Sequence, residues 1–357
     1  MTDTAEQRRI ARAQCREFLN GDGLVTPTQL LSSIDPDVVP DVYGDGGIVA
    51  DLERYVASLL AKPSAVFLPS GTMAQAATLR VHADRRTSRT VVWHPTCHLD
   101  KHEGQGFSRL HSLTGRPVGS ADQLLTLDNL QGVAEPVAAL LLELPAREIG
   151  GQLPSWADLL GQVEWARSRG AATHLDGARL WEASAGYDRT PAEIAALFDT
   201  VYVSFYKGIG ALPGCCVAGS TEIVAEVREW RRRLGGTLYA MWPSASSAMS
   251  LLPQRLAEMP GRMAHMRAIA VELAKIAGVT VVPGTPQVPM VHLLLPVSLE
   301  RFAENSAQLA RQQVWTWPAA MPTLNPEVVR IELTVGRATC ALPAQRVAAL
   351  IEELSAN

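Results

Sequence analysis

Short apolar runs alternate with longer amphipathic stretches through the first two thirds of the chain. Five runs, at residues 64–69, 90–95, 137–144, 172–176 and 200–206, are almost continuously apolar. Such runs are typical of strands whose two faces are both covered by other elements. Because helical stretches separate most of these runs, the order predicts parallel pairing with right-handed crossovers.

The stretches between these runs predict helices. Two kinds of signal support this: apolar positions that recur at helical spacing, and residues typical of helix ends. One or the other is present at residues 46–62, 71–83, 155–170 and 221–236. The apolar run 214–220 follows the strand at 200–206 too closely for a crossover helix. We therefore expect 214–220 to return antiparallel.

The pattern changes beyond residue 221. Residues 244–278 predict a long helix with a break at Pro260. Short strands and helices follow, predicted near 279–284, 290–296, 298–312, 328–333 and 343–355. We therefore predict an N-terminal helix and arm over 1–40 (the helix over the first 20 residues), a large α/β domain over 41–250, and a smaller α+β domain over 251–357.

Composition narrows the functional classes. The chain has 357 residues, 47% of them hydrophobic and 19% charged, with a net charge of −4. This charge argues against binding to nucleic acid, and no apolar run is long enough for a membrane helix. The N-terminal stretch has no apolar signal core, so we expect a cytoplasmic protein. The five cysteines form no C-x-x-C pair and are expected to be small buried side chains.

Polar residues follow four of the predicted strands. His94 and His98 follow the apolar residues 90–93, and Glu143 follows the apolar residues 138–142. Asp176 ends the run at 172–176, and Lys207 follows the run at 200–206. Ligands of an open parallel sheet collect at the carboxyl ends of its strands. We therefore expect these side chains to meet at one edge.

Asp176 and Lys207 are the most informative pair, 31 residues apart and each at the end of an apolar run. One interpretation is a buried salt bridge. The other is that Lys207, with its pKa lowered by burial, forms a Schiff base with pyridoxal 5'-phosphate. Asp176 would then keep the ring nitrogen of that cofactor protonated.

Such a cofactor needs a phosphate site. Ser70, Gly71 and Thr72 stand where a strand leads into a helix, and free amides at a helix start favour a dianion. An ordinary helix-capping turn without a ligand would have the same sequence pattern. No G-x-G-x-x-G follows the first strand and no G-K-[ST] is present, which leaves a dinucleotide or P-loop site without support.

The segment 94–103 contains further polar residues. His98 could stack on a cofactor ring, or it could be an ordinary half-buried histidine. His94, Asp100, His102 and Glu103 could suggest a metal site, but their spacing matches no metal motif, and we expect no metal.

Two arginines are candidates for holding a substrate carboxylate by paired hydrogen bonds. Arg179 lies three residues after Asp176, and Arg330 lies in the predicted strand at 328–333. Either could instead be a surface arginine.

Three stretches resemble one known family. They are HLDGARLWEA, the pair DVYGDGGIVADLE and FLPSGTMAQ, and SFYKGIGALPG, and the match runs from about Asp41 to Gly236 and more weakly to the end of the chain. They resemble the threonine aldolase and β-eliminating lyase family of pyridoxal-phosphate enzymes. The resemblance implies fold type I: a mostly parallel seven-stranded sheet with helices on both faces, plus a smaller α+β C-terminal domain. It also implies a homodimer or homotetramer with active sites at the subunit interface.

The resemblance also implies roles for individual residues. Lys207 would be the cofactor lysine, Asp176 the partner of the pyridine nitrogen, and His98 the stacking residue. The remaining roles are a phosphate cradle at Ser70, Gly71 and Thr72 with Ser204 nearby, carboxylate binding at Arg179 and Arg330, and a contact to the neighbouring subunit's site at Tyr43.

The chain departs from the family pattern mainly at residues that would surround the substrate, here called the substrate shell. The region that usually reads R-S-D-T is LLSSIDPDVVP here, and an extra helix precedes it. The family's E-N-T-H is ELPA at 143–146, so the polar contacts after Glu143 are lost. Tyr206 stands where serine is usual, and Tyr239 where arginine is usual.

We therefore predict an enzyme of amino-acid metabolism that acts on a small amino-acid substrate. The first hypothesis is cleavage of a 3-hydroxy amino acid to glycine and an aldehyde, with His98 or His94 as the base. The second is β-elimination, in which Lys207 removes the Cα proton. The third is a protein that binds the cofactor with little turnover.

Overall fold

The computed structural model describes residues 5–356, which form two compact units. The small unit contains the residues up to Pro27, residues 150–152 and the residues from Glu258 onward. The large unit contains residues 28–149 and 153–257. Residues 5–27 thus belong with the C-terminal part of the chain, whereas the sequence prediction grouped residues 1–40 as a separate N-terminal helix and arm.

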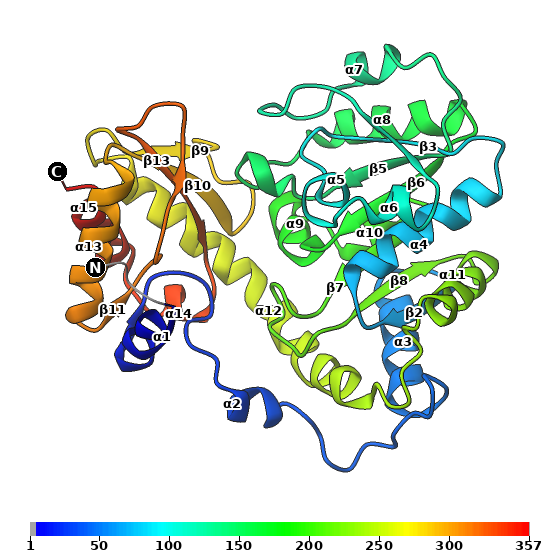
Figure 1. Ribbon diagram of the computed structural model, residues 1–357, viewed down its shortest axis with the longest axis horizontal. Coiled ribbons are helices and arrows are strands. Elements are labelled where there is room, and N and C mark those ends of the chain that lie inside the picture. The colour runs from blue at the N-terminus through cyan, green and yellow to red at the C-terminus, as the bar shows by residue number, and fades with distance from the viewer. Residues whose placement is uncertain (1–4, 357) are drawn as a thin grey trace. The chain divides into compact units, whose positions relative to one another are not determined.

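A mostly parallel sheet forms the centre of the large unit (Figure 1). Its order is β2-β8-β7-β6-β5-β3-β4, and β8 runs antiparallel to both of its neighbours, as predicted. The strands are β2 Ser64–Leu68, β3 Thr90–Trp93, β4 Thr114–Pro117, β5 Ala139–Glu143, β6 Ala172–Gly177, β7 Thr200–Ser204 and β8 Cys215–Gly219. Every residue of β6, β7 and β8 is buried, which explains why these strands are continuously apolar or small.

Helices cover both faces of this sheet. They are α3 Gly47–Leu59, α4 Gly71–Asp84, α5 His98–His102, α6 Gly106–Arg109, α7 Leu127–Gln131, α8 Trp156–Ser168, α9 Leu180–Tyr187, α10 Pro191–Ala195 and α11 Thr221–Arg233. The short helix α2, Pro27–Leu31, has no buried residue. Trp93 and Leu141 face a core shared with α4, α5 and α6. Leu140 and Leu142 alternate with Leu141 along β5 and are also buried, and α8 contacts β5 and β6.

Local sequence signals explain where several of these helices begin. The hydroxyls of Ser155 and Ser220 accept hydrogen bonds from the amides of Asp158 and Ile223 at the starts of α8 and α11. α4 differs, because its N-cap residue Ser70 makes no side-chain capping bond. The first amides of α4 are therefore left for another partner.

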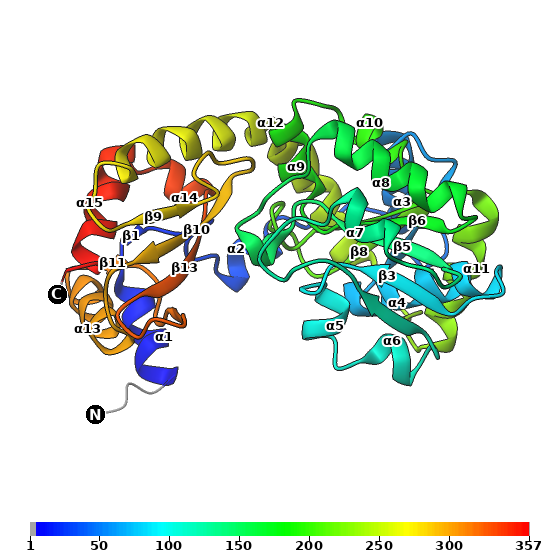
Figure 2. The ribbon, with the colours of Figure 1, turned by 90° about the horizontal axis from the view of Figure 1, so that it is seen from above.

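The small unit is built on an antiparallel sheet of four strands in the order β12-β13-β10-β9 (Figure 2). Its strands are β9 Thr280–Val282, β10 Met290–Leu295, β12 Met321–Pro322 and β13 Val329–Thr334, with a separate pair β1 Glu17–Phe18 and β11 Val314–Trp315. Its other helices are α1 Ala5–Gln14, α13 Leu299–Arg311, α14 Arg337–Cys340 and α15 Ala344–Leu354. Alternate residues of β10 and β13 pack against α13, α15 and the long helix α12 (Trp242–Leu273) in one core. Residues 1–4 of the predicted N-terminal helix lie outside the described residues.

The long helix α12, Trp242–Leu273, continues through Pro260 without interruption. The predicted break at Pro260 is therefore wrong. Met259, Met263 and Met266 are buried on either side of the proline. Burial of these side chains offsets the roughly 3 kcal/mol that an interior proline costs a helix.

Candidate active site

The carboxyl ends of β5, β6 and β7 bring the predicted polar residues together. Glu143 and Asp176 are paired neighbours on β5 and β6, and Asp176 is in turn paired with Tyr202 on β7. Lys207 follows β7 by three residues. Glu143, Asp176 and Lys207 line one pocket, so the edge predicted from the sequence is the edge at which they meet.

Lys207 has a free amine. Among residues 5–356, no hydrogen bond or ion pair engages it, and its side chain is half-buried rather than buried as we expected. The chain has three other lysines, and each has a partner: Lys62 donates to the Phe198 carbonyl, Lys101 lies 3.8 Å from Asp100, and Lys275 pairs with Glu272. The simple salt bridge between Lys207 and Asp176 is not formed.

Asp176 is only 6% exposed, and its Oδ1 accepts a hydrogen bond from the amide of Ala178 at 2.9 Å. Burial, and secondly the charge of Asp176, raise the pKa of Glu143 to about 8. Glu143 therefore holds a proton at neutral pH, and its Oε1 accepts from the amide of His98 at 2.6 Å. Two carboxyl groups thus line the pocket, and the raised pKa of Glu143 favours its neutral form.

His98 begins α5 and lines the same pocket. Its Nδ1 lies 2.9 Å from Oε1 of the buried Glu103. This hydrogen bond raises the pKa of His98. Glu103 therefore fixes the orientation of the ring, as a stacking residue requires.

The start of α4 contacts Tyr202, the residue paired with Asp176 on the neighbouring strand. A Cβ at position 71 would overlap the hydroxyl of Tyr202, so only glycine fits there. Tyr202 is the strand partner of Asp176, and burial raises its pKa. The side chain of Ser204 is buried beside the phenols of Tyr202 and Tyr206. The uncapped amides after Ser70 thus lie next to a buried group of hydroxyls, a donor set that suits a phosphate.

Arg179 stands at the N-cap of α9 and lines the pocket. Its Nη1 lies 3.3 Å from Oε1 of Glu182, which is almost completely buried. A Cβ at position 208 would overlap the same carboxylate of Glu182, so the glycine after Lys207 leaves room for it. Glu182 therefore supports both the arginine and the lysine loop, a role that the sequence analysis missed.

The structure does not bring His94 into this pocket. The Nδ1 of His94 accepts from the amide of Thr96 at 3.2 Å, and its Nε2 donates to the Gln123 carbonyl at 2.7 Å. His94 lines a neighbouring apolar pocket with Trp93 and Leu141. Since both of its ring nitrogens are engaged, the geometry disfavours His94 as a base.

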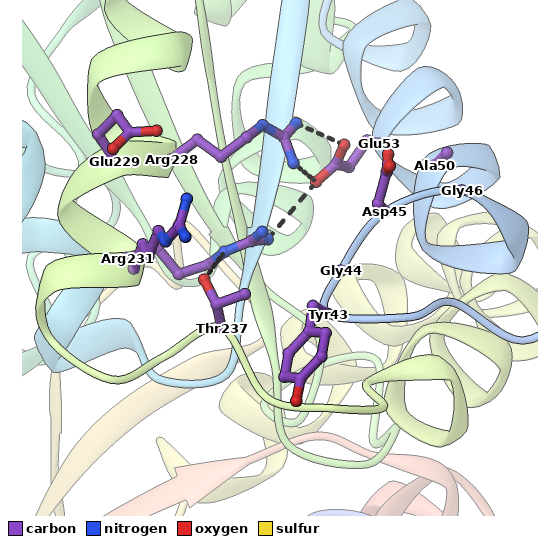
Figure 3. A pocket seen from close by; sticks show the side chains of 11 residues that line it. Tyr43, Gly44, Asp45, Gly46, Ala50, Glu53, Arg228, Glu229, Arg231 and Thr237 are labelled. Atoms are coloured by element: carbon purple, nitrogen blue, oxygen red, sulfur yellow. Dashed lines mark hydrogen bonds and ion pairs between the residues drawn. The ribbon is translucent and has the colours of Figure 1, made fainter.

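Tyr43 lies in another pocket of the large unit (Figure 3). There Arg228 forms a two-pronged ion pair with Glu53, and Arg231 donates to the Phe67 carbonyl and the Thr237 hydroxyl. Tyr43 is 58% exposed, and its ring contacts Tyr239 edge-on. Tyr43 is therefore not a wall of the pocket that contains Lys207.

Arg330 belongs to the small unit. It lies in β13, and its Nη2 is 3.4 Å from Sδ of Met321. Its role in carboxylate binding stays a prediction.

The pocket also contains residues to which the sequence analysis gave no role. Thr96, His102, Arg147 and Glu148 line it together with Lys207. His102 and Arg147 both bind the same oxygen of Glu148. They come from the short helix α5 and from the 3₁₀ turn Arg147–Ile149, which directly follows the altered segment 143–146.

Residues 5–356 do not meet the requirements of a membrane-spanning helix or of a metal site. No helix there is long and apolar enough to cross a membrane. Within the same residues, no group of three or more histidine, cysteine, aspartate or glutamate side chains is arranged to hold a metal ion.

Comparison with known proteins identifies relatives over most of the chain. Residues 37–294 match the family described as β-eliminating lyase. A probable low-specificity L-threonine aldolase 2 of Arabidopsis thaliana is 27% identical over 304 residues, which cover 81% of this chain and 85% of that protein.

Two solved structures are similar over nearly the whole chain. A putative L-allo-threonine aldolase from Listeria monocytogenes EGD-E is 36% identical, covers 97% of both chains and has a TM-score of 0.91. A putative aromatic amino acid β-eliminating lyase/threonine aldolase from Exiguobacterium sp. 255-15 is 34% identical, with coverage of 97% of this chain and 98% of that one, also at 0.91. The predicted fold class and the predicted family are confirmed.

Proposed function

Because this chain belongs to the β-eliminating lyase family, we propose that it is a pyridoxal-phosphate-dependent lyase that cleaves a 3-hydroxy amino acid to glycine and an aldehyde. The observation that carries the proposal is the pocket itself, in which a lysine without a partner lies beside a buried aspartate. The threonine aldolases among its relatives support the reaction type.

The residues of the pocket suit pyridoxal 5'-phosphate. Lys207 would hold its aldehyde carbon, Asp176 its ring nitrogen, and His98 one face of its ring. The amides after Ser70, with Gly71, Thr72 and the hydroxyl of Ser204, would hold its phosphate. When bound, the cofactor supplies an electron sink for the charge that develops at the substrate Cα.

The remaining residues orient the substrate. Arg179 would take its carboxylate in paired hydrogen bonds, and Glu182 holds the guanidinium in place for this. Arg330 is the second candidate for that carboxylate. The raised pKa of Glu143 favours its neutral carboxyl form, and this favours binding of an anionic substrate.

Product analysis tests this proposal. The purified protein, loaded with pyridoxal 5'-phosphate, would be incubated with threonine, allo-threonine and phenylserine, and separately with cysteine and tryptophan. We expect glycine and the matching aldehyde from the first group. Formation of ammonia and a keto acid without glycine would show that the reaction is β-elimination and not aldol cleavage. No product from any of these substrates would contradict both reactions.

We further propose that the protein is a homodimer or homotetramer of the cytoplasm, with active sites at the subunit interface. The exposed Tyr43 beside an arginine-rich pocket supports such an interface. Light scattering would measure the mass of the assembly. We expect two or four copies, and Tyr43→Ala should lower turnover only if Tyr43 reaches the partner's site.

A further inference from the structure

A histidine–carboxylate pair lies at the wall of the active-site pocket. The Nε2 of His102 is 3.2 Å from Oε1 of Glu148, and Nη1 of Arg147 is 3.1 Å from the same oxygen. The side chain of His102 is 44% exposed and that of Glu148 is 26% exposed. The pair is thus half-open to solvent and lines the pocket that contains Lys207.

The three histidines near this pocket differ in what their ring nitrogens do. His94 uses both nitrogens for Thr96 and Gln123 and lines the neighbouring pocket. His98 gives Nδ1 to Glu103. His102 gives Nε2 to Glu148, and within residues 5–356 no hydrogen bond engages its Nδ1.

The contact with Glu148 determines which nitrogen of His102 is basic. A carboxylate accepts, so Nε2 of His102 carries the proton and donates to Glu148. Nδ1 then keeps its lone pair and is free to take a proton. An imidazole held on one side by a carboxylate and open on the other is the usual arrangement of a general base.

We propose that His102 takes the hydroxyl proton of the substrate and that Glu148 positions it. This inference rests on the proposed cleavage of a 3-hydroxy amino acid. The proton of the β-hydroxyl goes to Nδ1, and the electron pair of the O–H bond forms the aldehyde C=O. The Cα–Cβ bond breaks, its electron pair stays with Cα, and Cα then takes a proton to give glycine. No oxidant or further reactant is needed.

Glu148 and Arg147 have separate parts in this step. The carboxylate of Glu148 stabilises the imidazolium that forms when His102 gains the proton. Arg147 donates to the same oxygen of that carboxylate and keeps it in place. Arg147 and Glu148 directly follow the segment 143–146, whose usual polar residues are missing in this chain. They hold His102 at this part of the pocket, so that His102 supplies the base there.

The test separates proton removal from the hydroxyl from chemistry at Cα. His102→Asn would be compared with wild type in two assays: cleavage of 3-hydroxy amino acids, and exchange of the glycine Cα proton in deuterated water followed by NMR. Exchange needs the cofactor but no base for a hydroxyl. We expect kcat for cleavage to fall by about a hundredfold to ten-thousandfold while exchange changes less than about threefold.

Two further variants complete the comparison. Glu148→Gln should lower kcat by about tenfold to a hundredfold with KM nearly unchanged, as for other residues that orient a reacting group. His94→Asn is the matched control and should keep cleavage within about threefold.

The outcomes decide between the inference and the function on which it rests. A wild-type enzyme that exchanges glycine but cleaves no 3-hydroxy amino acid would contradict the proposed function. A cleaving wild type with an equally active His102→Asn variant would overturn the role of His102. Equal loss of cleavage and exchange in that variant would also overturn it, because the damage would then affect the whole site.

Discussion

Two polar clusters of the large unit share the same three elements. In the interior, His174 of β6 binds Gln75 of α4 and Thr200 of β7, and His82 of α4 binds the same threonine. At the carboxyl edge, β6 supplies Asp176, β7 supplies Ser204 and leads to Lys207, and α4 begins after Ser70, whose side chain makes no capping bond. The two clusters are neighbours, because His174 and Asp176 lie only two residues apart on β6.

The clusters differ in whether their hydrogen-bonding groups are used. Both nitrogens of His174 have partners, and burial lowers the pKa of His174 and of His82 to about 3. At the edge, the amine of Lys207 and the first amides of α4 have no partner among the described residues. A satisfied buried cluster stabilises the fold, whereas an unsatisfied cluster at a sheet edge is available to a ligand.

The largest effect is expected for Lys207→Ala. Loss of the amine should abolish the visible absorbance of the bound cofactor and lower turnover by about a thousandfold or more. Lys101→Ala, at an exposed position, is the matched control and should change neither. A Lys207→Ala variant that still shows the visible absorbance and turns over substrate would contradict the role of Lys207 in holding the cofactor.

Asp176→Asn is expected to have the next largest effect on activity. The amide oxygen can still accept from the amide of Ala178, so the fold and part of the cofactor binding should persist. Loss of the negative charge should lower kcat by about a hundredfold or more, as when one electrostatic contact in a closed site is removed. Steady-state kinetics and absorbance spectra on the same sample check this, and unchanged kcat would contradict it.

The sequence predicted the parts of this picture that depend on strand period and strand ends. Continuous apolar runs located six of the seven strands, and their carboxyl ends located Asp176 and Lys207. β4, Thr114–Pro117, was missed because an exposed edge strand has no apolar pattern, and its Gly115 is required by the ring of Trp93.

The remaining site residues could not be predicted because loops position them. His102, Arg147 and Glu148 meet through a short helix and a 3₁₀ turn, whose conformations follow no periodicity. The burial of His174 was equally hidden, since a histidine within an apolar strand gives no sign of whether it binds a ligand or only neighbouring side chains. The break predicted at Pro260 failed because tertiary packing outweighed a local preference.

His174→Ala tests the interior cluster. It leaves Gln75 without its buried partner, leaves Thr200 with His82 as its remaining side-chain partner and opens a cavity, so the free energy of unfolding should fall by about 2–4 kcal/mol. His102→Ala, at the half-open edge, should change it by less than about 1 kcal/mol. Urea unfolding of both variants checks the contrast, and equal losses would erase the distinction between the clusters.

The smallest effect is expected in the pH dependence of stability. An unfolded histidine binds a proton below about pH 6.5, but buried His82 and His174 do so only near pH 3. The unfolded chain thus holds more protons in this window, so the free energy of unfolding falls as pH falls from 6.5. Each histidine adds at most about 1.4 kcal/mol per pH unit. His82→Gln should reduce the slope between pH 6.5 and 5, and an unchanged slope would contradict this assignment.

The central claim is that Lys207 carries the cofactor, and the chain has only four lysines at which this can be tested. Borohydride reduction of the cofactor-loaded protein fixes the cofactor to its lysine, and digestion followed by mass spectrometry locates it. We expect one modified peptide, the one that contains Lys207. Modification at Lys62, Lys101 or Lys275 instead, or at no lysine, would contradict the account.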